Sequence, residues 1–171
     1  ATPDDLKHLY ARVERRLRPD TWLVIAGSLP PPCTGEVYRA LIEQVERAGA
    51  GSVLDADGPV VRDVLDGGGR PTLIKMNADE FSRISGAPVG TEDEVLDAAE
   101  AIRRLGVPSV VVTRGGSGAV AVTAEGEYRV RIPRIQVVSA RGAGDAFLAG
   151  LLFGLRRNET WPEALRRAGA A

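Results

Sequence analysis

The sequence contains little of the chemistry on which disulfide scaffolds and protein zinc sites depend. Its 171 residues include one cysteine, Cys33, and one histidine, His8. A single cysteine cannot form an intrachain disulfide, and a cysteine-rich zinc site cannot be assembled. Long uncharged apolar runs, a signal-peptide pattern and lipidation motifs are also lacking, so we expect a cytoplasmic protein.

Neither sign of charge predominates. Lysine and arginine number 22, aspartate and glutamate number 23, and the basic residues are spread among the acidic ones. Binding to nucleic acids or membranes favours a basic stripe or patch, so we expect neither as a partner. Hydrophobic residues make up 44% and charged residues 26%, the balance of a globular protein. Because the length lies in the usual single-domain range, we predict one domain over residues 1–171.

Short apolar runs alternate with segments of helical periodicity along the chain. Strands are predicted at residues 21–27, 51–55, 73–76 and 109–113, and helices at residues 37–48, 91–105 and 145–156. Thr91 and Glu94 have the spacing of a capping box at a helix start. This alternation predicts an α/β fold with a mainly parallel sheet. Such sheets bind ligands beyond the carboxyl ends of their strands, so we expect the functional residues in those loops.

Three strand segments carry more specific predictions. Residues 21–27 and 109–113 are short, mainly apolar runs, which predicts buried strands, the second of them at the centre of the sheet. Residues 119–132 contain two alternating segments around a glycine-bearing turn. They predict an antiparallel hairpin at the edge of the sheet.

The most distinctive segment is residues 141–145, Arg-Gly-Ala-Gly-Asp, directly before an apolar helix. Free amides and the helix dipole make such a helix start suitable for a phosphate group. Amides of Ala143, Gly144 and Asp145 could stabilise the charge of a phosphoryl group during its transfer. The Asp145 carboxylate could accept a proton from an attacking hydroxyl. Local sequence leaves a structural alternative open, because aspartate is common as a helix cap and glycine in tight turns.

Five motifs occur in the order found in one enzyme family. They are Gly27-Ser28-Leu29-Pro30-Pro31, Leu54-Asp55 with Gly58, Ile74-Lys75-Met76-Asn77 with Glu80, Val112-Thr113 with Gly115, Gly118 and Ala119, and Gly142 to Phe147 with Ala149-Gly150. From about residue 20 to the end, the chain resembles the ribokinase-like (pfkB) carbohydrate kinases, in particular phosphofructokinases and tagatose-phosphate kinases. The resemblance implies part of a ribokinase-like three-layer αβα sandwich.

The resemblance also implies a reaction. The chain would use ATP and Mg²⁺ to phosphorylate a hydroxyl of a sugar or sugar phosphate, of the fructose 1-phosphate or tagatose 6-phosphate type. Asp145 would be the general base, with Gly142, Ala143 and Gly144 forming the anion hole. Asn77 and Glu80 match the motif that organises magnesium and its waters.

The remaining site residues are assigned on the same basis. Thr113, Gly115 and Gly118 match a segment that contacts the nucleotide, and Ser28 belongs to the wall between sugar and nucleotide. Lys75 would lie along the phosphates or, alternatively, be solvated. Arg141, which replaces the residue usual in the family, would contact a phosphate or be solvated.

The chain also departs from the family pattern. Pro32 stands where the family has glycine, and Met76 replaces a proline. The family's N-terminal region, which supplies sugar-binding residues and a lid that often mediates dimerisation, has no counterpart here. We therefore interpret the chain as part of a kinase that forms a homodimer at full length, and expect an exposed sheet edge in the isolated chain. A kinase for ribose or a ketodeoxy acid, and a non-catalytic nucleotide-binding or assembly module, are the alternative functions.

Overall fold

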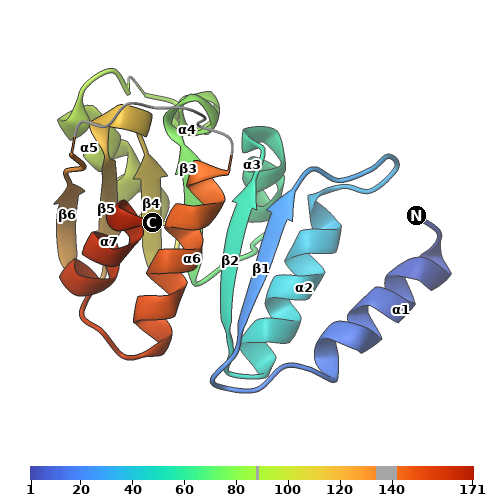
Figure 1. Cartoon of the computed structure of the whole chain (residues 1–171). Coiled ribbons are helices and arrows are strands. Elements are labelled where there is room, and N and C mark those ends of the chain that lie inside the picture. The colour runs from blue at the N-terminus through green and yellow to red at the C-terminus, as the bar shows by residue number, and fades with distance from the viewer. Residues whose placement is uncertain (88, 134–141) are drawn as a thin grey trace.

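The computed structural model describes residues 1–87, 89–133 and 142–171 (Figure 1). Over these residues, one sheet holds six strands in sequence order: β1 (Trp22–Gly27), β2 (Gly51–Ala56), β3 (Leu73–Asn77), β4 (Ser109–Thr113), β5 (Ala119–Thr123) and β6 (Gly126–Val130). Strands β1 to β4 are parallel to one another, whereas β5 and β6 pair antiparallel. The mainly parallel sheet and the hairpin at its edge are thus confirmed.

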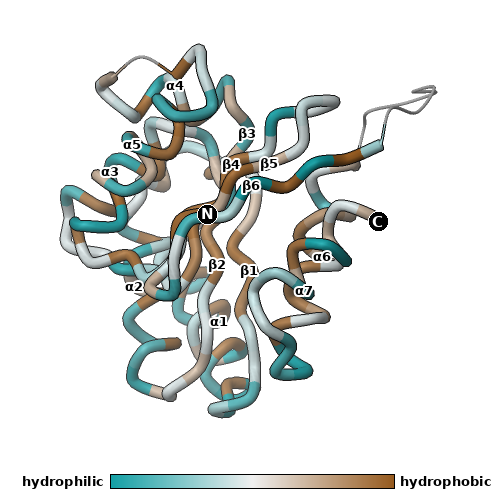
Figure 2. The backbone as a smooth tube through the Cα atoms, turned by 90° about the vertical axis from the view of Figure 1, so that its left-hand side faces the viewer, coloured by the Kyte–Doolittle hydropathy of each residue, from teal (hydrophilic) through white to brown (hydrophobic). Residues whose placement is uncertain are grey.

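Helices cover both faces of this sheet. They are α1 (Pro3–Glu14), α2 (Gly35–Arg47), α3 (Gly58–Asp66), α4 (Ala78–Ser85), α5 (Glu92–Arg103), α6 (Ala143–Arg156) and α7 (Trp161–Ala170), with a short 3-10 helix, η1, at Gly115–Ser117. Helices α2 to α5 pack on one face, and α6 and α7 lie on the other (Figure 1). Hydrophobic residues run along the strands between these helical layers (Figure 2). The three-layer αβα sandwich is therefore confirmed.

The two faces bury separate hydrophobic clusters. Because side chains alternate along a strand, Leu54 and Ile74 point into the α2–α5 face, while Val53 and Leu73 point toward α6 and α7. Side chains from α6 and α7, including Leu151 and Leu165, complete the second cluster. Helix α1 contributes only partly buried residues to the first cluster and contains no fully buried one.

Strand β4 is buried as predicted, but the prediction for β1 is wrong. Within β1 only Ile25 is buried, and the Val24 side chain is 43% exposed. The cause is position, because β1 forms one end of the strand order and pairs with β2 alone. The expected exposed sheet edge is this strand. Within the described part of the chain, no helix has the length and apolar character needed to cross a membrane.

Candidate active site

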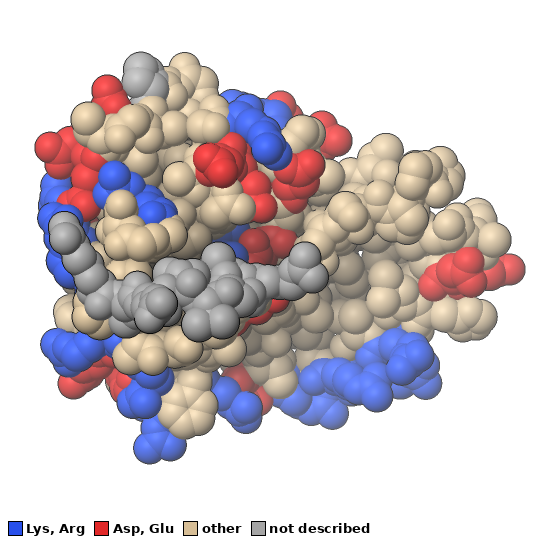
Figure 3. Space-filling view, turned by 45° about the horizontal axis from the view of Figure 1, so that its top comes forward, with Lys and Arg blue, Asp and Glu red and all other residues tan. Residues whose placement is uncertain are grey.

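A cleft of about 480 Å³ opens at the carboxyl ends of the first three strands, beside the start of α6. It is lined by Ala26, Gly27, Ser28, Asp55, Ala56, Asp57, Lys75, Asn77, Glu80 and Asp145. Figure 3 looks toward this end of the sheet and shows acidic side chains gathered beside a hollow in the surface. The cleft lies where parallel α/β sheets bind ligands, and it unites predicted site residues from three separate motifs, namely Ser28, the Lys75–Asn77–Glu80 group and Asp145.

Asn77 and Glu80 are held together by a capping box at the start of α4. The Asn77 side-chain oxygen accepts a hydrogen bond from the Glu80 amide at 2.9 Å, and Glu80 Oε2 accepts one from the Asn77 amide at 2.9 Å. The box satisfies two amides that the helix start would otherwise leave unpaired. It also holds both side chains next to each other at the cleft, as expected for two residues that would organise one magnesium ion.

The donor chemistry of this pair suits Mg²⁺, which prefers oxygen ligands and keeps several waters. The second carboxylate oxygen of Glu80 is not used in the capping box. Among the described residues, no group of three or more His, Cys, Asp and Glu side chains could enclose a metal ion. A magnesium ion held here would take oxygen ligands from this pair and keep water molecules in its remaining positions.

Lys75 and Asp55 form a buried ion pair at the floor of the cleft. Lys75 Nζ lies 2.8 Å from Asp55 Oδ2, and the two side chains are 6% and 12% exposed. Parallel pairing of β2 with β3 aligns Leu54 with Ile74, so the next residues, Asp55 and Lys75, come side by side on one face. The alternative of a solvated lysine is thus wrong.

Asp55 was not among the predicted site residues, although it belongs to one of the five motifs. A carboxylate at the end of an apolar strand was the available signal. Its partner could not be identified without the register of β2 against β3, because the two residues are 20 positions apart.

The amino end of α6 begins at Gly142, which has φ +80° and caps the helix without a side-chain hydrogen bond. A glycine adopts this left-handed conformation readily and supplies no side chain to occupy the first amides. Asp145 follows in the first turn and lines the cleft. A Cβ atom built on Gly144 would lie 2.8 Å from Lys75 Nζ, so the ammonium lies directly against this turn.

Thr113, Gly115 and Gly118 lie at the end of β4 and in the loop that follows, which we call the glycine loop (residues 114–118). None of the three lines the cleft. Thr113 Oγ1 donates to the Met76 carbonyl at 3.4 Å, which places it beside the end of β3. A Cβ on Gly118 would lie 1.9 Å from the Val130 carbonyl oxygen, so packing against β6 already requires glycine there. Arg141 lies outside the described residues.

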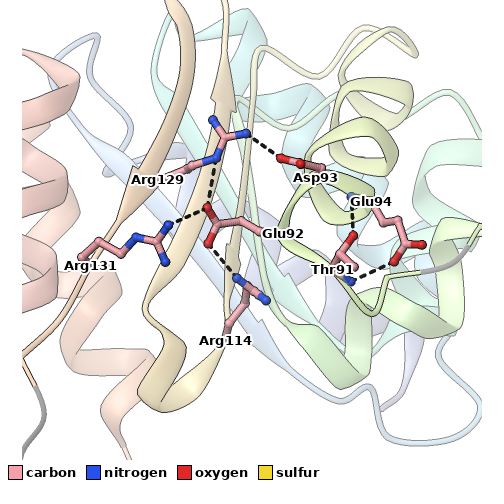
Figure 4. Close-up of polar contacts among 7 residues, drawn as sticks. All are labelled: Thr91, Glu92, Asp93, Glu94, Arg114, Arg129 and Arg131. Carbon is pink, nitrogen blue, oxygen red and sulfur yellow. Dashed lines mark hydrogen bonds and ion pairs between the residues drawn. The ribbon is translucent and has the colours of Figure 1, made fainter.

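An ion-pair cluster beside the glycine loop was not predicted (Figure 4). The Glu92 carboxylate, at the start of α5, lies 2.9 Å from Arg114, 3.0 Å from Arg129 and 3.2 Å from Arg131. Glu92 and Arg114 are each 18% exposed. The cluster therefore links α5, the glycine loop and β6. Arg114 and Arg131 are 22 and 39 residues from Glu92 in the sequence, so only the folded sheet brings them together.

Comparison with known proteins identifies the family. Residues 3–171 match the model of the pfkB family carbohydrate kinases. Phosphofructokinase-2 from Escherichia coli, in its tetrameric inhibited form, is 29% identical with a TM-score of 0.90, over 99% of this chain and 56% of that one. Aminoimidazole riboside kinase from Salmonella enterica is 29% identical with a TM-score of 0.68, over 90% of this chain and 55% of that one.

A third structure shares the fold. Ribokinase from Arabidopsis thaliana, complexed with ribose and ATP, is 24% identical with a TM-score of 0.74, over 99% of this chain and 51% of that one. The chain thus spans little more than half the length of the enzymes that it matches. The resemblance inferred from the five motifs is confirmed by the family match over nearly the whole chain, and the chain belongs to the pfkB family of carbohydrate kinases.

Proposed function

We propose that this chain forms the nucleotide-binding and catalytic part of an ATP-dependent sugar kinase in which Asp145 is the general base. One observation carries the proposal: a single cleft holds Asp145, the amino end of α6, a buried lysine and the Asn77–Glu80 pair. These groups supply a proton acceptor, an anion site and oxygen ligands for a divalent cation. Phosphoryl transfer depends on the same three functions.

The amino end of α6 is the proposed anion site. The amides of Ala143, Gly144 and Asp145 belong to the first turn, where no preceding turn supplies carbonyl partners. The helix dipole adds partial positive charge at this end. A phosphoryl group in transfer spreads negative charge over its oxygens, and fixed amide donors stabilise that charge without reorganising.

The charge of the cleft supports the use of magnesium. Among the residues that the structure describes, its lining contains four carboxylates, from Asp55, Asp57, Glu80 and Asp145, against one ammonium, from Lys75. A free triphosphate would be repelled by this excess of negative charge. A divalent cation bound with the nucleotide offsets that repulsion, and the oxygens of Asn77 and Glu80 suit such an ion.

Asp145 is the proposed base because its carboxylate lies at the cleft beside the anion site. The carboxylate accepts the proton of the sugar hydroxyl while the hydroxyl oxygen forms its bond to the γ-phosphorus. The bond from that phosphorus to the bridging oxygen breaks, and ADP carries the released electron pair. The proton is thus held by Asp145, and the phosphoryl group is held by the product.

We further propose a sugar phosphate as the acceptor, of the fructose or tagatose phosphate type. The motif at residues 27–31 is of the phosphosugar kinase type, and its Ser28 lines the cleft. Phosphofructokinase-2 from Escherichia coli, 29% identical to this chain, has a structure in complex with fructose-6-phosphate. Both observations favour a hexose phosphate over a free pentose.

A phosphotransfer assay of the full-length protein with labelled ATP and a panel of hexose phosphates tests the proposal. We expect Asp145→Asn to lower kcat by roughly 10²-fold or more, because general-base catalysis contributes that much. Asp93→Asn is the matched control, since Asp93 also lies in the first turn of a helix but is 84% exposed and does not line the cleft. An Asp145→Asn rate equal to that of the control would contradict the base assignment. Full-length protein that binds ATP but transfers no phosphate to any sugar would favour a non-catalytic binding module.

A further inference from the structure

We propose that Asp55 is a positioning residue: its carboxylate fixes the Lys75 ammonium, and that ammonium in turn sets the position of the first turn of α6. The consequence for catalysis rests on the function proposed above, because this turn carries Asp145. The structural part stands on three observations, namely the burial of the ion pair, its contact with Gly144 and the charge at the helix end.

Burial makes Lys75 depend on Asp55. Its neighbours in β3, Ile74 and Met76, are fully buried in the opposite face of the sheet, so the lysine side chain emerges toward α6. A buried ammonium without a counter-charge is strongly unfavourable, and removing one member of a buried pair leaves the other uncompensated. Asp55, at 2.8 Å, supplies the counter-charge and holds Nζ in one place.

The contact with Gly144 makes Nζ a spacer between the sheet and the helix. A Cβ at residue 144 would lie 2.8 Å from Nζ and 3.6 Å from Cε of Lys75. The ammonium therefore occupies the volume that a side chain of α6 would otherwise fill. A solvated lysine could swing aside, but this one is fixed by its ion pair. The distance between the α6 amino end and β3 is thus set by Lys75.

The charges explain why the spacer needs a carboxylate. A helix amino end carries partial positive charge, so an ammonium against it is repelled unless its charge is offset. Asp55 offsets that charge. Without it, the other carboxylates that line the cleft, Asp145 among them, would compete for Lys75, and an ion pair with Asp145 would occupy the proposed base. Asp55 therefore keeps Asp145 in position and leaves the Asp145 carboxylate free to accept a proton.

A double-mutant cycle in urea unfolding tests the spacer independently of any activity. Gly144→Ala inserts a Cβ against Nζ, whereas Lys75→Leu removes Cε and Nζ and leaves room for that Cβ. We expect Gly144→Ala to raise the unfolding equilibrium constant about tenfold more in the wild-type background than in the Lys75→Leu background, a coupling of about 1.4 kcal/mol. Equal effects in both backgrounds would overturn the proposal.

Lysine labelling with acetic anhydride gives a second measurement in case Gly144→Ala does not fold. The sequence contains two lysines, Lys75 and Lys7, and the Lys7 side chain is 80% exposed, so it serves as an internal standard. We expect Lys75 to react at least about tenfold more slowly than Lys7, and this ratio to fall several-fold in Asp55→Asn because the ammonium loses its anchor. An unchanged ratio in folded Asp55→Asn would overturn the proposal.

MgATP affinity, measured by calorimetry on the folded chain, then separates positioning from a general charge effect. Asp55→Asn and Asp57→Asn remove the same charge from the same cleft, but Asp57 pairs with Arg83 and not with Lys75. We expect Asp55→Asn to raise the MgATP dissociation constant about tenfold, and Asp57→Asn to lower it, because a less negative cleft repels the triphosphate less. Similar changes in both variants would overturn the positioning role. A wild-type chain that binds no MgATP would instead contradict the proposed function, and the double-mutant cycle would still decide the spacer.

Discussion

The Glu92 carboxylate accepts a hydrogen bond from Arg114 at 2.9 Å, which ties the first residue of α5 to the residue that begins the glycine loop. The same carboxylate contacts Arg129 and Arg131 of the neighbouring hairpin (Figure 4). Helix α5 and the glycine loop are therefore connected through one mostly buried side chain.

Glu92→Gln should destabilise the chain by about 1–3 kcal/mol, because glutamine removes the charge and replaces one of the two acceptor oxygens that contact the arginines with an amide donor. Amides of the glycine loop should exchange their hydrogens faster as well. Glu100→Gln is the control, since Glu100 lies on the same helix, is 21% exposed and pairs locally with Arg103 and Arg104. Urea unfolding should show a cost of only about 0.5 kcal/mol there. Equal costs would mean that the cluster adds nothing beyond local helix pairs.

Gly118→Ala should be far more damaging than Gly115→Ala. Both residues have positive φ, +88° and +52°, so each substitution costs roughly 1–2 kcal/mol from the backbone conformation. At Gly118 the new Cβ would also lie 1.9 Å from the Val130 carbonyl oxygen, whereas at Gly115 nothing lies within 4 Å. We expect a total of at least about 3 kcal/mol for Gly118→Ala in thermal unfolding. Similar costs at both sites would refute the packing explanation.

Stability should fall in acid as the Thr91–Glu94 capping box loses its charge. The hydrogen bond from the Thr91 backbone amide lowers the pKa of Glu94 below its ordinary value of 4.5. Because the folded-state pKa is the lower one, ionised Glu94 stabilises the folded chain above about pH 4.5, and this stabilisation is lost as the pH falls through the folded-state pKa.

Glu94→Gln isolates this contribution, because glutamine can keep the capping hydrogen bond without the charge. The difference in free energy of unfolding between the wild type and Glu94→Gln should be present at neutral pH and should vanish as the pH falls through the lowered pKa of Glu94. A difference that stays constant across this range would show that the charge of Glu94 does not contribute.

The sequence was most informative where local chemistry decides the structure. Apolar runs located β2, β3 and β4, and the spacing of Thr91 and Glu94 correctly placed the start of α5. Helices α1, α3 and α4 were not predicted. Helices α3 and α4 have only nine and eight residues, too short for a clear periodicity.

Features that depend on how distant segments meet could not be predicted. The exposure of β1 follows from its place at one end of the strand order, and its apolar sequence is the same in either position. The Asp55–Lys75 pair follows from the register of two strands, and the Glu92 cluster from three elements that meet beside the glycine loop. In each case the sequence gives the residue types, but tertiary structure decides which residues become neighbours.

Calorimetric titration of the chain with ATP, with and without magnesium, tests the central claim most directly. The titration should be repeated with two double variants. One combines Asn77→Ala with Glu80→Ala, and the other combines Thr91→Ala with Glu94→Ala, which removes an equivalent capping box from α5. We predict magnesium-dependent binding that weakens at least about tenfold in the first variant and is unchanged in the second. A folded chain that binds no nucleotide, or equal losses in both variants, would contradict the assignment of this cleft as the nucleotide site.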